Sequence, residues 1–545
     1  MTRPWTSRNG VEIRDLVPPE TRRDWVRQGL CPDRDLHTLF RERVREHPHR
    51  DAVLDQERVL DYAALDREVR RIAAALEAAG LGPRDIIGIR LPNGWRMAAA
   101  ELAIAAIGAV ALPYPAGRGS SDTRSLLGRS RAAAGIFGAV EDADVAAELP
   151  DVRTAFTFGA GSSAAHPSLD DLPDADWQPR PVDPEAPARI LVTSGSQAEP
   201  KMIAYSHNAM GGGRANYVRA LHDDDGPMRG LVLMKMASGY GSCATSVGIA
   251  ALGASLILAD HFDPAEALRL VTRHRPTHLF GVPTMLRRLS EQQAEPGEDL
   301  SSLRTVVSSA APLSDVTAHA CQQRFDARVI TVYGSSDGIN CHTARTGTGN
   351  GSGTGLPDPA AAEIRVVDAD GRDVPRGQSG EIWARGPMTP LCYVADRDLD
   401  ALLRTPEGWV RSGDLGTFDA DGRLHVLGRL EQVISRGGLT ISPAEVEREL
   451  RAHPSIVDAA CVPVPDDDLG ERMCACLSQA AGSAELDLPE ITAFLEQQRG
   501  LERTKLPELL LRLPELPLAP TGKVCRHTVT TMAVNTHRTP EMPRS

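Results

Sequence analysis

The amino-acid sequence predicts an α/β protein built from more than one domain. Its 545 residues exceed what one hydrophobic core usually holds, so two or more domains are expected. Helix-like and strand-like patterns alternate through most of the chain, which is typical of helices layered on largely parallel sheets. From Ala362 short strands separated by turns replace this alternation, and after Ile434 helices and strands return. Layered sheets, a hairpin-rich part and a final mixed part are therefore expected in this order.

The first part of the chain has the clearest periodic patterns. Apolar side chains recur at helical spacing from Tyr62 to Ala79 and stop at Gly80, a residue type that commonly ends helices. Short runs rich in branched apolar residues predict strands between such helices. The expected elements are a helix over 62–79, a strand over 85–91, a helix over 101–107, a strand over 109–112, and the same alternation over 249–258, 264–274 and 278–282.

The middle and final parts follow different patterns. The dipeptides at residues 370–371 and 421–422 are both Asp-Gly, which is typical of tight β-hairpin turns, and short apolar runs flank each of them. Antiparallel hairpins are therefore expected here. The expected elements are strands over 364–368, 381–385, 414–419 and 424–427, then a helix over 443–453, a strand over 456–464 and a helix over 488–498.

Composition argues against several classes of protein. A net charge of −13 and only 4% aromatic residues weigh against a nucleic-acid binder, which usually carries a basic face and stacking side chains. The most apolar stretch, residues 98–113, contains Glu101 and is too short to span a membrane, so it predicts a buried helix running into a strand. Residues 1–15 lack the apolar run of a secretory signal. The nine cysteines have no paired spacing, which favours free thiols in the reducing cytoplasm.

A hydroxyl-rich turn follows the apolar strand that is expected to end before Thr193. Residues 193–201 offer backbone N–H groups, hydroxyls and the Lys201 ammonium, a set that can surround phosphate oxygens. The Walker pattern of a P-loop is absent from the segment. Taken alone, the segment is as compatible with an ordinary strand-to-helix turn as with a phosphate site.

Two further strand ends carry carboxylates. In residues 331–338, Tyr333 can stack on a planar base and Asp337 can hold Mg²⁺, although a turn with an Asx cap has the same pattern. In residues 408–415, Asp414 follows a glycine at the head of a strand. A carboxylate there can bind a ribose diol or cap a turn.

The order and spacing of these segments are more specific than any one of them. Two more glycine-containing segments follow, with Arg429 at the start of the first and Lys523 near the end of the second. Together the segments resemble the adenylate-forming superfamily of acyl-CoA synthetases, luciferases and peptide-synthetase adenylation domains, and stand-alone ligases for aryl acids look most similar. The resemblance covers residues 35–524, with supporting matches in residues 280–284, 303–314, 377–387 and 438–446.

The resemblance implies a two-domain enzyme. A large N-terminal domain of layered sheets and helices with a hairpin-rich subdomain, residues 1–429, would bind ATP and the acid. A small mobile α+β C-terminal domain, residues 430–545, would carry Lys523 and swing about a hinge at Glu431. The expected enzyme is an AMP-forming ligase that uses ATP and Mg²⁺.

The resemblance also assigns roles to individual residues. A carboxylate is a poor nucleophile toward an anionic phosphate, so the reaction needs cations that remove the repulsion and stabilise the transition state. The implied catalytic residues are Lys523, Arg429 and Lys201. The implied ATP site comprises Thr193, Ser194, Gly195, Ser196 and Gln197 at the β and γ phosphates, Ser309, Ala310 and Ala311 at the adenine, Tyr333 stacked on the base, Gly334 and Ser335 beside it, Asp337 at Mg²⁺, and Asp414 and Arg429 at the ribose or phosphate. The implied acid pocket comprises Met236, Ser238, Tyr240, Ser242 and Cys243.

The chain departs from the superfamily pattern at several positions. Gln197 and Ala198 replace a usual Thr-Gly in the phosphate turn, and Met202 replaces a glycine. Asp337 is shorter than the usual Glu, and Cys392 replaces the usual Gly before a tyrosine. Because the cationic residues are retained, these changes indicate altered ATP handling or a specialised reaction rather than loss of activity.

The substrate and the acceptor stay open at this point. Residues 236–244 lack the Asp that binds an α-ammonium group and the His that many acyl and aryl relatives place near Ser238, so an ordinary α-amino acid is disfavoured. The leading expectation is a small aromatic carboxylic acid, activated in secondary metabolism and passed to CoA or to the phosphopantetheine thiol of a separate carrier protein. The alternatives are nitrite activation for diazotisation of an aromatic amine, and a non-catalytic binding or scaffold protein. A cytoplasmic monomer or homodimer without nucleic-acid or membrane partners is expected.

Overall fold

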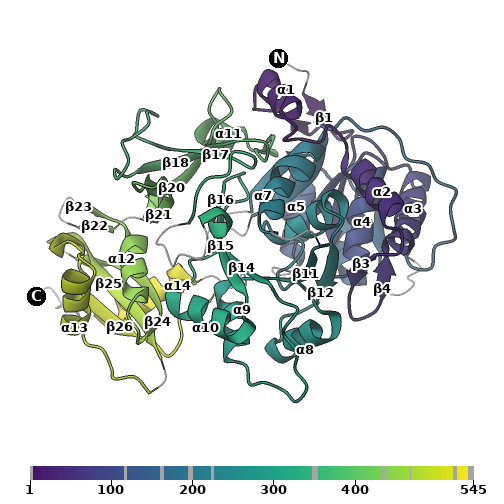
Figure 1. Ribbon diagram of the computed structural model, residues 1–545. Helices are drawn as coiled ribbons and strands as arrows, with labels where there is room; N and C mark the ends of the chain where they lie inside the picture. Colours follow the sequence, from purple (N-terminus) through teal and green to yellow (C-terminus); the bar gives the residue numbers. More distant parts are fainter. Residues whose placement is uncertain are drawn as a thin grey trace, which may run out of the picture.

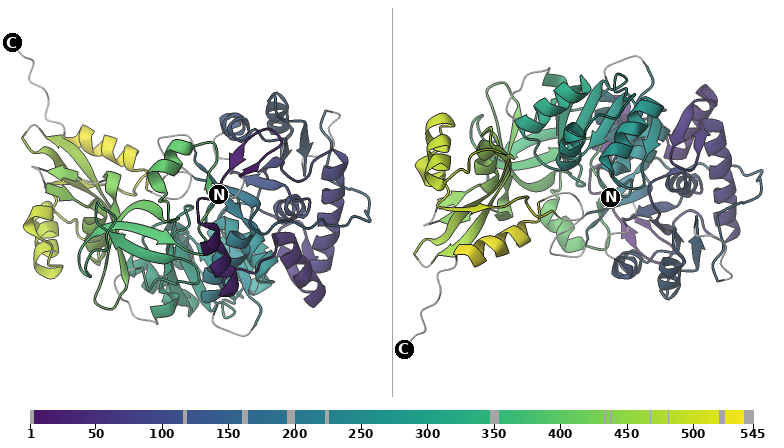
Figure 2. Two further views of the ribbon diagram at one scale, coloured as in Figure 1. Left: turned by 90° about the horizontal axis from the view of Figure 1, so that it is seen from above. Right: turned by 90° about the horizontal axis from the view of Figure 1, so that it is seen from below.

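The computed structural model of the protein describes residues 4–115, 119–159, 165–193, 200–222, 226–346, 354–432, 434–436, 439–466, 468–480, 482–518 and 524–537, with the backbone alone at residues 431, 439 and 440. Figure 1 shows a large N-terminal body of helices and sheets, an antiparallel sheet in green beside it, and a C-terminal sheet with its own helices at the other end. The views from above and below show the same order (Figure 2). The mixed α/β architecture predicted from the sequence is confirmed.

Two large sheets form the N-terminal body. The strands of the first are β5 (Ile86–Arg90), β6 (Val110–Pro113), β7 (Ala134–Phe137), β8 (Thr154–Thr157), β9 (Pro187–Val192), β10 (Met202–Ser206) and β19 (Cys392–Tyr393). Those of the second are β3 (Asp51–Leu54), β4 (Val59–Asp61), β11 (Arg229–Val232), β12 (Ser255–Leu258), β13 (His278–Gly281), β14 (Thr305–Ser309), β15 (Arg328–Gly334) and β16 (Asn340–His342). The order is β19-β10-β9-β6-β5-β7-β8 in the first and β16-β15-β14-β13-β11-β12-β3-β4 in the second. The strands β5 to β9 and β11 to β15 pair in parallel, as the βα rhythm predicted.

Helices cover and separate these sheets. They are α2 (Leu36–Glu46), α3 (Tyr62–Ala78), α4 (Trp95–Ala106), α5 (Ser120–Ser130), α6 (Val140–Ala147), α7 (Ala215–Ala220), α8 (Pro264–His274), α9 (Pro283–Glu291) and α10 (Asp315–Phe325). Residues of α3 and α4 share one buried cluster with Ile87 of the first sheet and Leu256 of the second, so both helices lie between the sheets. The helices expected over 62–79 and 264–274 are confirmed. The helix expected from Glu101 begins earlier, at Trp95, and a π-helical turn, Ala244–Ala251, precedes β12.

The interior position of α4 explains its composition. Nearly every residue of this helix is buried, including Glu101. The carboxylate of Glu101 accepts a hydrogen bond from Arg189 of β9 at 2.5 Å, and the two side chains are 3% and 2% exposed. Burying either charge without the other would be costly. The acidic residue in the apolar stretch therefore bonds α4 to the seven-stranded sheet.

An antiparallel sheet follows, as the Asp-Gly turns predicted. Its strands are β17 (Glu363–Val367), β18 (Gly380–Arg385), β20 (Val410–Phe418) and β21 (Leu424–Arg429), in that order, and α11 (Arg397–Leu403) lies between β18 and β20 in the chain. The strand expected from Asp414 begins at Val410, because the residues before Asp414 pair with β18. Asp414 and Arg429 face each other as register partners across β20 and β21.

The C-terminal part has its own sheet and its own core. The strands are β22 (Ile434–Arg436), β23 (Leu439–Ile441), β24 (Ile456–Asp466), β25 (Gly470–Gln479) and β26 (Leu509–Arg512), and the helices are α12 (Pro443–Arg451), α13 (Leu488–Ala493) and α14 (Arg526–His537). The single helix expected over 488–498 is α13 followed by a π-helical turn, Phe494–Gln498. Two buried apolar clusters occupy this part, and both consist only of residues after Ile434 or Ile434 itself.

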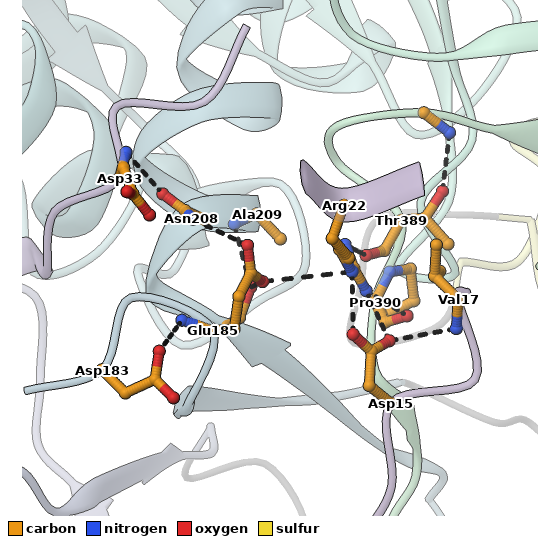
Figure 3. A network of polar contacts seen from close by, with 12 residues as sticks. Asp15, Val17, Arg22, Asp33, Asp183, Glu185, Asn208, Ala209, Thr389 and Pro390 are labelled. Atoms are coloured by element: carbon orange, nitrogen blue, oxygen red, sulfur yellow. Dashed lines mark hydrogen bonds and ion pairs between the residues drawn. The ribbon is translucent and has the colours of Figure 1, made fainter. Parts of the chain in front are cut away.

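The N-terminal segment is tied to the edge of the seven-stranded sheet. It contains β1 (Trp5–Thr6), β2 (Glu12–Ile13) and α1 (Pro19–Arg27). Arg22 of α1 is 4% exposed and donates to both carboxylate oxygens of Asp15 at 3.0 Å (Figure 3). It also donates to the carbonyl oxygen of Thr389 at 2.9 Å, just before β19. One buried guanidinium thus joins α1, its preceding loop and β19.

Replacing Arg22 with methionine is expected to lower the free energy of unfolding by about 3 kcal/mol, because Asp15 and the carbonyl of Thr389 lose their buried donor. Urea unfolding followed by circular dichroism measures the change. The matched control is Arg27→Met on the same helix. The side chain of Arg27 is 63% exposed, so its loss is expected to change stability by less than about 1 kcal/mol. Equal losses for the two variants would contradict the role of Arg22.

Candidate active site

The predicted phosphate-binding turn closes the hairpin between β9 and β10. The backbone N–H of Thr193 donates to the carbonyl of Lys201 at 3.0 Å, and the N–H of Lys201 donates to the hydroxyl of Thr193 at 3.2 Å. These two bonds hold the ends of the turn together. Ser194, Gly195, Ser196 and Gln197 lie outside the described residues, so their predicted phosphate contacts stay predictions.

Lys201 is grouped with two side chains that are distant in sequence. Its ammonium nitrogen lies 5.9 Å from the centre of the Tyr393 ring, a favourable position for a cation over an aromatic face. The hydroxyl of Tyr393 donates to a carboxylate oxygen of Asp337. Burial and the negative charge of Asp337 raise the pKa of Tyr393 far above its ordinary value, so the hydroxyl keeps its proton and acts as the donor. The structure therefore joins the predicted phosphate cation to the predicted Mg²⁺ ligand.

Two hydrogen bonds hold the loop that carries Asp337 in place. Tyr205 of β10 donates from its hydroxyl to the carbonyl of Ser336 at 2.8 Å. The hydroxyl of Ser335 accepts the backbone N–H of Asp337 at 3.1 Å. The carboxylate of Asp337 is consequently held in the turn after β15, where Tyr393 lies between it and Lys201 at the end of the phosphate turn.

A second group of side chains gathers at Asp414. One carboxylate oxygen accepts the hydroxyl of Tyr333 at 2.6 Å, and the other lies 2.7 Å from the guanidinium nitrogen Nε of Arg429. The side chain of Asp414 is 7% exposed, whereas that of Arg429 is 53% exposed. Burial and the adjacent carboxylate raise the pKa of Tyr333 well above its ordinary value, so Tyr333 stays a proton donor. Three predicted ATP-site residues from two different sheets therefore form one unit.

The predicted adenine segment lies beside this unit. Ser309, at the end of β14, donates from its hydroxyl to the carbonyl of Val332 in the neighbouring strand at 3.0 Å. Ala310 follows with a φ of +77°, a left-handed conformation that residues with a Cβ rarely adopt. Strain of this kind concentrates at functional sites. Ala311 is exposed and Gly334, at the end of β15, is exposed as well, so the two strand ends present open backbone at the same edge of the sheet.

The predicted acid pocket is a compact turn before the π-helical turn Ala244–Ala251. The hydroxyl of Ser238 accepts the N–H of Gly241 at 3.0 Å, and the hydroxyl of Ser242 donates to the carbonyl of Gly239 at 2.6 Å. Tyr240 packs edge-on against Phe280 at 6.4 Å between ring centres. The turn is thus rigid and presents small polar groups.

Met236 and Cys243 of the predicted pocket differ in how deeply they are buried. Met236 is 1% exposed and belongs to the main apolar core together with Met234, an arrangement that favours core packing over contact with a substrate. Cys243 is half-buried, and its sulfur lies 2.9 Å from the hydroxyl of Tyr217.

Sequence reasoning missed the groups that hold the site residues in place. Tyr205, Arg214 and the Tyr393 hydroxyl were not assigned roles, although each bonds a predicted site residue or its immediate neighbour. No periodic pattern marks them, since Tyr393 is 56 residues from its partner Asp337. Only the pairing of β10 with β19 brings the Tyr393 and Lys201 segments together.

The C-terminal residues of the predicted site are partly outside the description. Lys523 lies outside the described residues, and of Glu431 only the backbone is described, in the turn Leu430–Gln432. The ends of the segment around Lys523 are held together, because Leu518 pairs with Val524. Glu515, just before it, lies 3.9 Å from Arg287 of α9. The segment with Lys523 therefore starts against the N-terminal body.

Comparison with known proteins identifies the class of protein that this arrangement serves. The family model of AMP-binding enzymes matches residues 40–394, and the model of the AMP-binding enzyme C-terminal domain matches residues 445–523. The chain belongs to the AMP-binding enzyme family. It is an adenylate-forming ligase.

Relatives of several activities are similar over nearly the whole chain. Triostin synthetase I of Streptomyces triostinicus is 31% identical over 521 residues, which cover 94% of this chain and 97% of that protein. A salicyl-AMP ligase of Mycobacterium tuberculosis is 30% identical over 92% of this chain and 91% of that protein. Among solved structures, the amide bond synthetase McbA of Marinactinospora thermotolerans is 29% identical with a TM-score of 0.81, covering 91% of this chain and 99% of that one. An anthranilate CoA ligase at 21% identity and a TM-score of 0.82 shares the fold.

The bond between Tyr333 and Asp414 leads to a prediction about ATP binding. Tyr333→Phe is expected to raise the KM for ATP roughly tenfold or more, because a hydrogen bond to a charged group is worth about 1.5 kcal/mol or more and Asp414 would lose its fixed orientation. Pyrophosphate release at varied ATP concentration measures the change. Tyr114→Phe is the matched control, since it removes a buried hydroxyl that contacts Thr123 at 3.2 Å and is expected to leave the KM unchanged. Similar KM values for both variants would refute the role of Tyr333.

Proposed function

We propose that the protein activates a small aromatic carboxylic acid with ATP and Mg²⁺, forming an acyl-adenylate and pyrophosphate, and then transfers the acyl group to a thiol of CoA or of a carrier protein. The observation that carries the proposal is the convergence of two groups of side chains on the end of β15 and the turn that follows it. Lys201, Tyr393 and Asp337 form one group, and Tyr333 and Asp414 with its Arg429 partner form the other.

The two groups suit the two ends of ATP. Asp414 would bind the ribose hydroxyls, since each carboxylate oxygen can accept more than one hydrogen bond and thus keep its present partners. The Tyr333 ring would stack on the adenine beside Ser309, Ala310 and Ala311. Lys201 and the turn from Thr193 onward would surround the β and γ phosphates, and Arg429 would approach the ribose or the α phosphate.

Asp337 fits a Mg²⁺ ion that is shared with phosphates. Mg²⁺ usually keeps several waters and takes one or two carboxylates plus substrate phosphate oxygens. Among the residues that the structure describes, no cluster of three or more His, Cys, Asp or Glu side chains forms a complete metal cage, which matches this mode of binding. The ion would neutralise charge on the phosphates, while Tyr393 orients the carboxylate of Asp337.

We further propose that residues 1–429 and 430–545 are the two domains and that the second rotates about Glu431. The apolar cores on either side of this boundary share no residue among those described. A cavity of about 490 Å³ lies at the junction, lined on one side by Leu415 and His425 and on the other by Glu445 and Arg448. Loose packing at this contact would allow Lys523 to approach the acid and the α phosphate in one orientation and to leave in another.

The relatives and the pocket support the proposed class of acid. The salicyl-AMP ligase and a 2-hydroxy-7-methoxy-5-methyl-1-naphthoate CoA ligase, 29% identical over 93% of this chain, act on aromatic acids. The turn with Ser238, Tyr240 and Ser242 offers hydroxyls and an aromatic wall but no carboxylate for an ammonium group. The acceptor would be a thiol, and the likeness to an amide bond synthetase makes an amine the first alternative to test.

The comparisons bear on the two alternative functions that the sequence left open. Family membership corrects the non-catalytic alternative, since the chain is an enzyme of the AMP-binding family. The relatives described above give no support to nitrite activation, so it is kept only as an arm of the test.

Among the described residues no helix combines the length and apolarity that crossing a membrane requires.

Analysis of nucleotide products tests the proposed function directly. Purified protein is incubated with ATP and Mg²⁺ and a panel of aromatic and short aliphatic acids. Each acid is tested with CoA, with a carrier protein, with an amine, or with no acceptor, and a separate arm replaces the acid with nitrite and an aromatic amine. AMP and pyrophosphate are expected with aromatic acids, and a thioester is expected when CoA or a carrier protein is present. Chelation of Mg²⁺ is expected to abolish both products. AMP formation only with nitrite and an aromatic amine, or with none of the acids, would refute the proposal.

Lys523→Ala is expected to reduce adenylate formation by at least about a hundredfold, because a cation that stabilises the transition state contributes on the order of 3 kcal/mol. The thermal unfolding midpoint is expected to stay unchanged. Arg503→Ala is a matched control in the same part of the chain, since its side chain is 84% exposed, and it is expected to keep full activity. Normal AMP formation by a folded Lys523→Ala protein would exclude the proposed role.

A further inference from the structure

One buried arginine beside the predicted acid pocket has an unusual environment. Arg214 ends the π-helical turn Ala209–Arg214 and is 4% exposed. Its Nη2 atom donates to the carbonyl of Gly239 at 2.8 Å and to the hydroxyl of Ser242 at 3.1 Å. Its guanidinium carbon lies 5.1 Å from the centre of the Tyr205 ring. The side chain therefore reaches the turn that is expected to hold the acid, from the side of β10.

Arg214 forms no ion pair with any residue that the structure describes. None of these residues places a carboxylate oxygen within 4.0 Å of its guanidinium, and its Nε and Nη1 atoms have no hydrogen-bond partner. Arg189, a second buried arginine whose pKa burial and the charge of Arg214 lower, is paired with Glu101. Within the described part of the chain, Arg214 is thus hydrogen-bonded but not ion-paired.

The aromatic neighbours of Arg214 do not supply the missing charge. Burial raises the pKa of Tyr205 to about 12 and raises the pKa of Tyr217 well above its ordinary value. Both hydroxyls are therefore protonated and neutral near pH 7. The sulfur of Cys243 lies 3.6 Å from Arg214 but shares its contact with the hydroxyl of Tyr217.

An unpaired buried cation is costly unless something else neutralises it. Isolated charges in protein interiors are normally paired or hydrogen-bonded, because desolvation costs several kcal/mol per ion. A missing partner next to a binding site indicates a ligand that completes the pair. The planar guanidinium fork matches the planar oxygens of a carboxylate and also binds a phenolate.

The contacts of Arg214 place it with the acid-pocket residues. The guanidinium bonds Gly239 and Ser242 and stacks on Tyr205, whose hydroxyl reaches the carbonyl of Ser336 beside Asp337. The reacting carboxyl must lie near the phosphates, and none of these contacts is with Lys201, Asp414 or Arg429, which are expected to bind ATP. A group of the acid other than the reacting carboxyl is therefore the candidate partner of Arg214.

We propose that Arg214 determines acid specificity by binding a second acidic group, a carboxylate or a phenolic oxygen, that the substrate carries in addition to the reacting carboxyl. This inference rests on the proposed acid activation and specifies its substrate class. The acid would enter with one acidic group at the phosphates and the other at the Gly239–Ser242 turn. Replacing that group with hydrogen would leave Arg214 buried and unpaired, so the enzyme would reject the simpler acid strongly.

The first test uses the wild-type enzyme and pairs of acids that differ only in the second group. Benzoate is compared with its three carboxy derivatives and its three hydroxy derivatives, and propionate with succinate, by AMP formation. The acid with the highest kcat/KM is expected to carry a second acidic group and to exceed its simpler partner by about a hundredfold. A best substrate with a single acidic group would overturn the inference.

The second test replaces Arg214. Arg214→Met is expected to reduce kcat/KM for the preferred acid about a hundredfold and to change that for its simpler partner less than threefold, with the KM for ATP unchanged. Arg214→Lys keeps the charge but loses the planar fork, and it is expected to recover part of the preference. Equal losses for both acids would show that Arg214 acts on the reacting carboxyl or on the fold, which contradicts the proposal.

A third measurement needs no substrate. Arg189→Met is the matched control, since Arg189 is also buried but is paired with Glu101. In the absence of ligands, Arg189→Met is expected to lower the thermal unfolding midpoint clearly, because it leaves a buried carboxylate unpaired. Arg214→Met is expected to lower it far less. An equal loss would show that Arg214 is already compensated within the protein, and would refute the inference whatever the activity.

These arms separate failure of the inference from failure of the proposed function. If no acid in any panel yields AMP, the proposed function fails, and the comparison of unfolding midpoints still decides whether Arg214 is unpaired. If acids yield AMP without preference for a second acidic group, the proposed function stands and the role of Arg214 is refuted.

Discussion

The carboxylate of Asp414 is the point on which the geometry of the site depends. It accepts the hydroxyl of Tyr333 from the eight-stranded sheet and pairs with Arg429 across the hairpin of the antiparallel sheet. The carboxylate thereby connects the eight-stranded sheet to the antiparallel sheet at the edge where the nucleotide is expected to bind. The carboxylate is nearly buried, which strengthens both interactions by removing competing water. A rigid contact here would keep the ribose and base positions fixed while the C-terminal part changes its orientation.

Three buried arginines differ in the partners that they contact, and these partners indicate what each arginine does. Arg22 is satisfied by Asp15 and by carbonyls next to β19, so it serves the fold. Arg189 is satisfied by Glu101, so it joins the central helix to the sheet. Arg214 has hydrogen bonds but, among the residues that the structure describes, no carboxylate partner. Proteins rarely keep an uncompensated charge inside without a use for it, since apolar substitution is usually neutral or stabilising. The difference among these residues is the physical basis for assigning Arg214 to the substrate.

A close approach explains one required glycine at the junction of the two parts. Gly428 precedes Arg429 and has a φ of +143°, a conformation available mainly to glycine. A Cβ atom at this position would lie 2.9 Å from the hydroxyl of Ser442 and 3.1 Å from the Cβ of Ala444, at the start of α12. The hydroxyl of Ser442 also donates to the carbonyl of Leu427. The junction combines this tight backbone contact with a cavity nearby, which suits a pivot better than a continuous core.

The α/β class, most helices and strands, the Asp-Gly hairpins and the family could be predicted from the sequence, because these depend on local periodicity, turn chemistry and the order of short motifs. Sequence patterns also placed Tyr333 and Asp337 at the end of one strand, which the structure bears out approximately, and Asp414 at the head of another, where it proved to lie within β20; the family resemblance added Arg429. Which of these residues touch could be seen only in the folded chain, since contacts between residues 56 to 81 positions apart leave no local pattern. The same reason applies to Arg214. Arginine side chains are mostly exposed, and it is the packing of distant segments that buries Arg214 between Tyr205 of β10 and the acid-pocket turn.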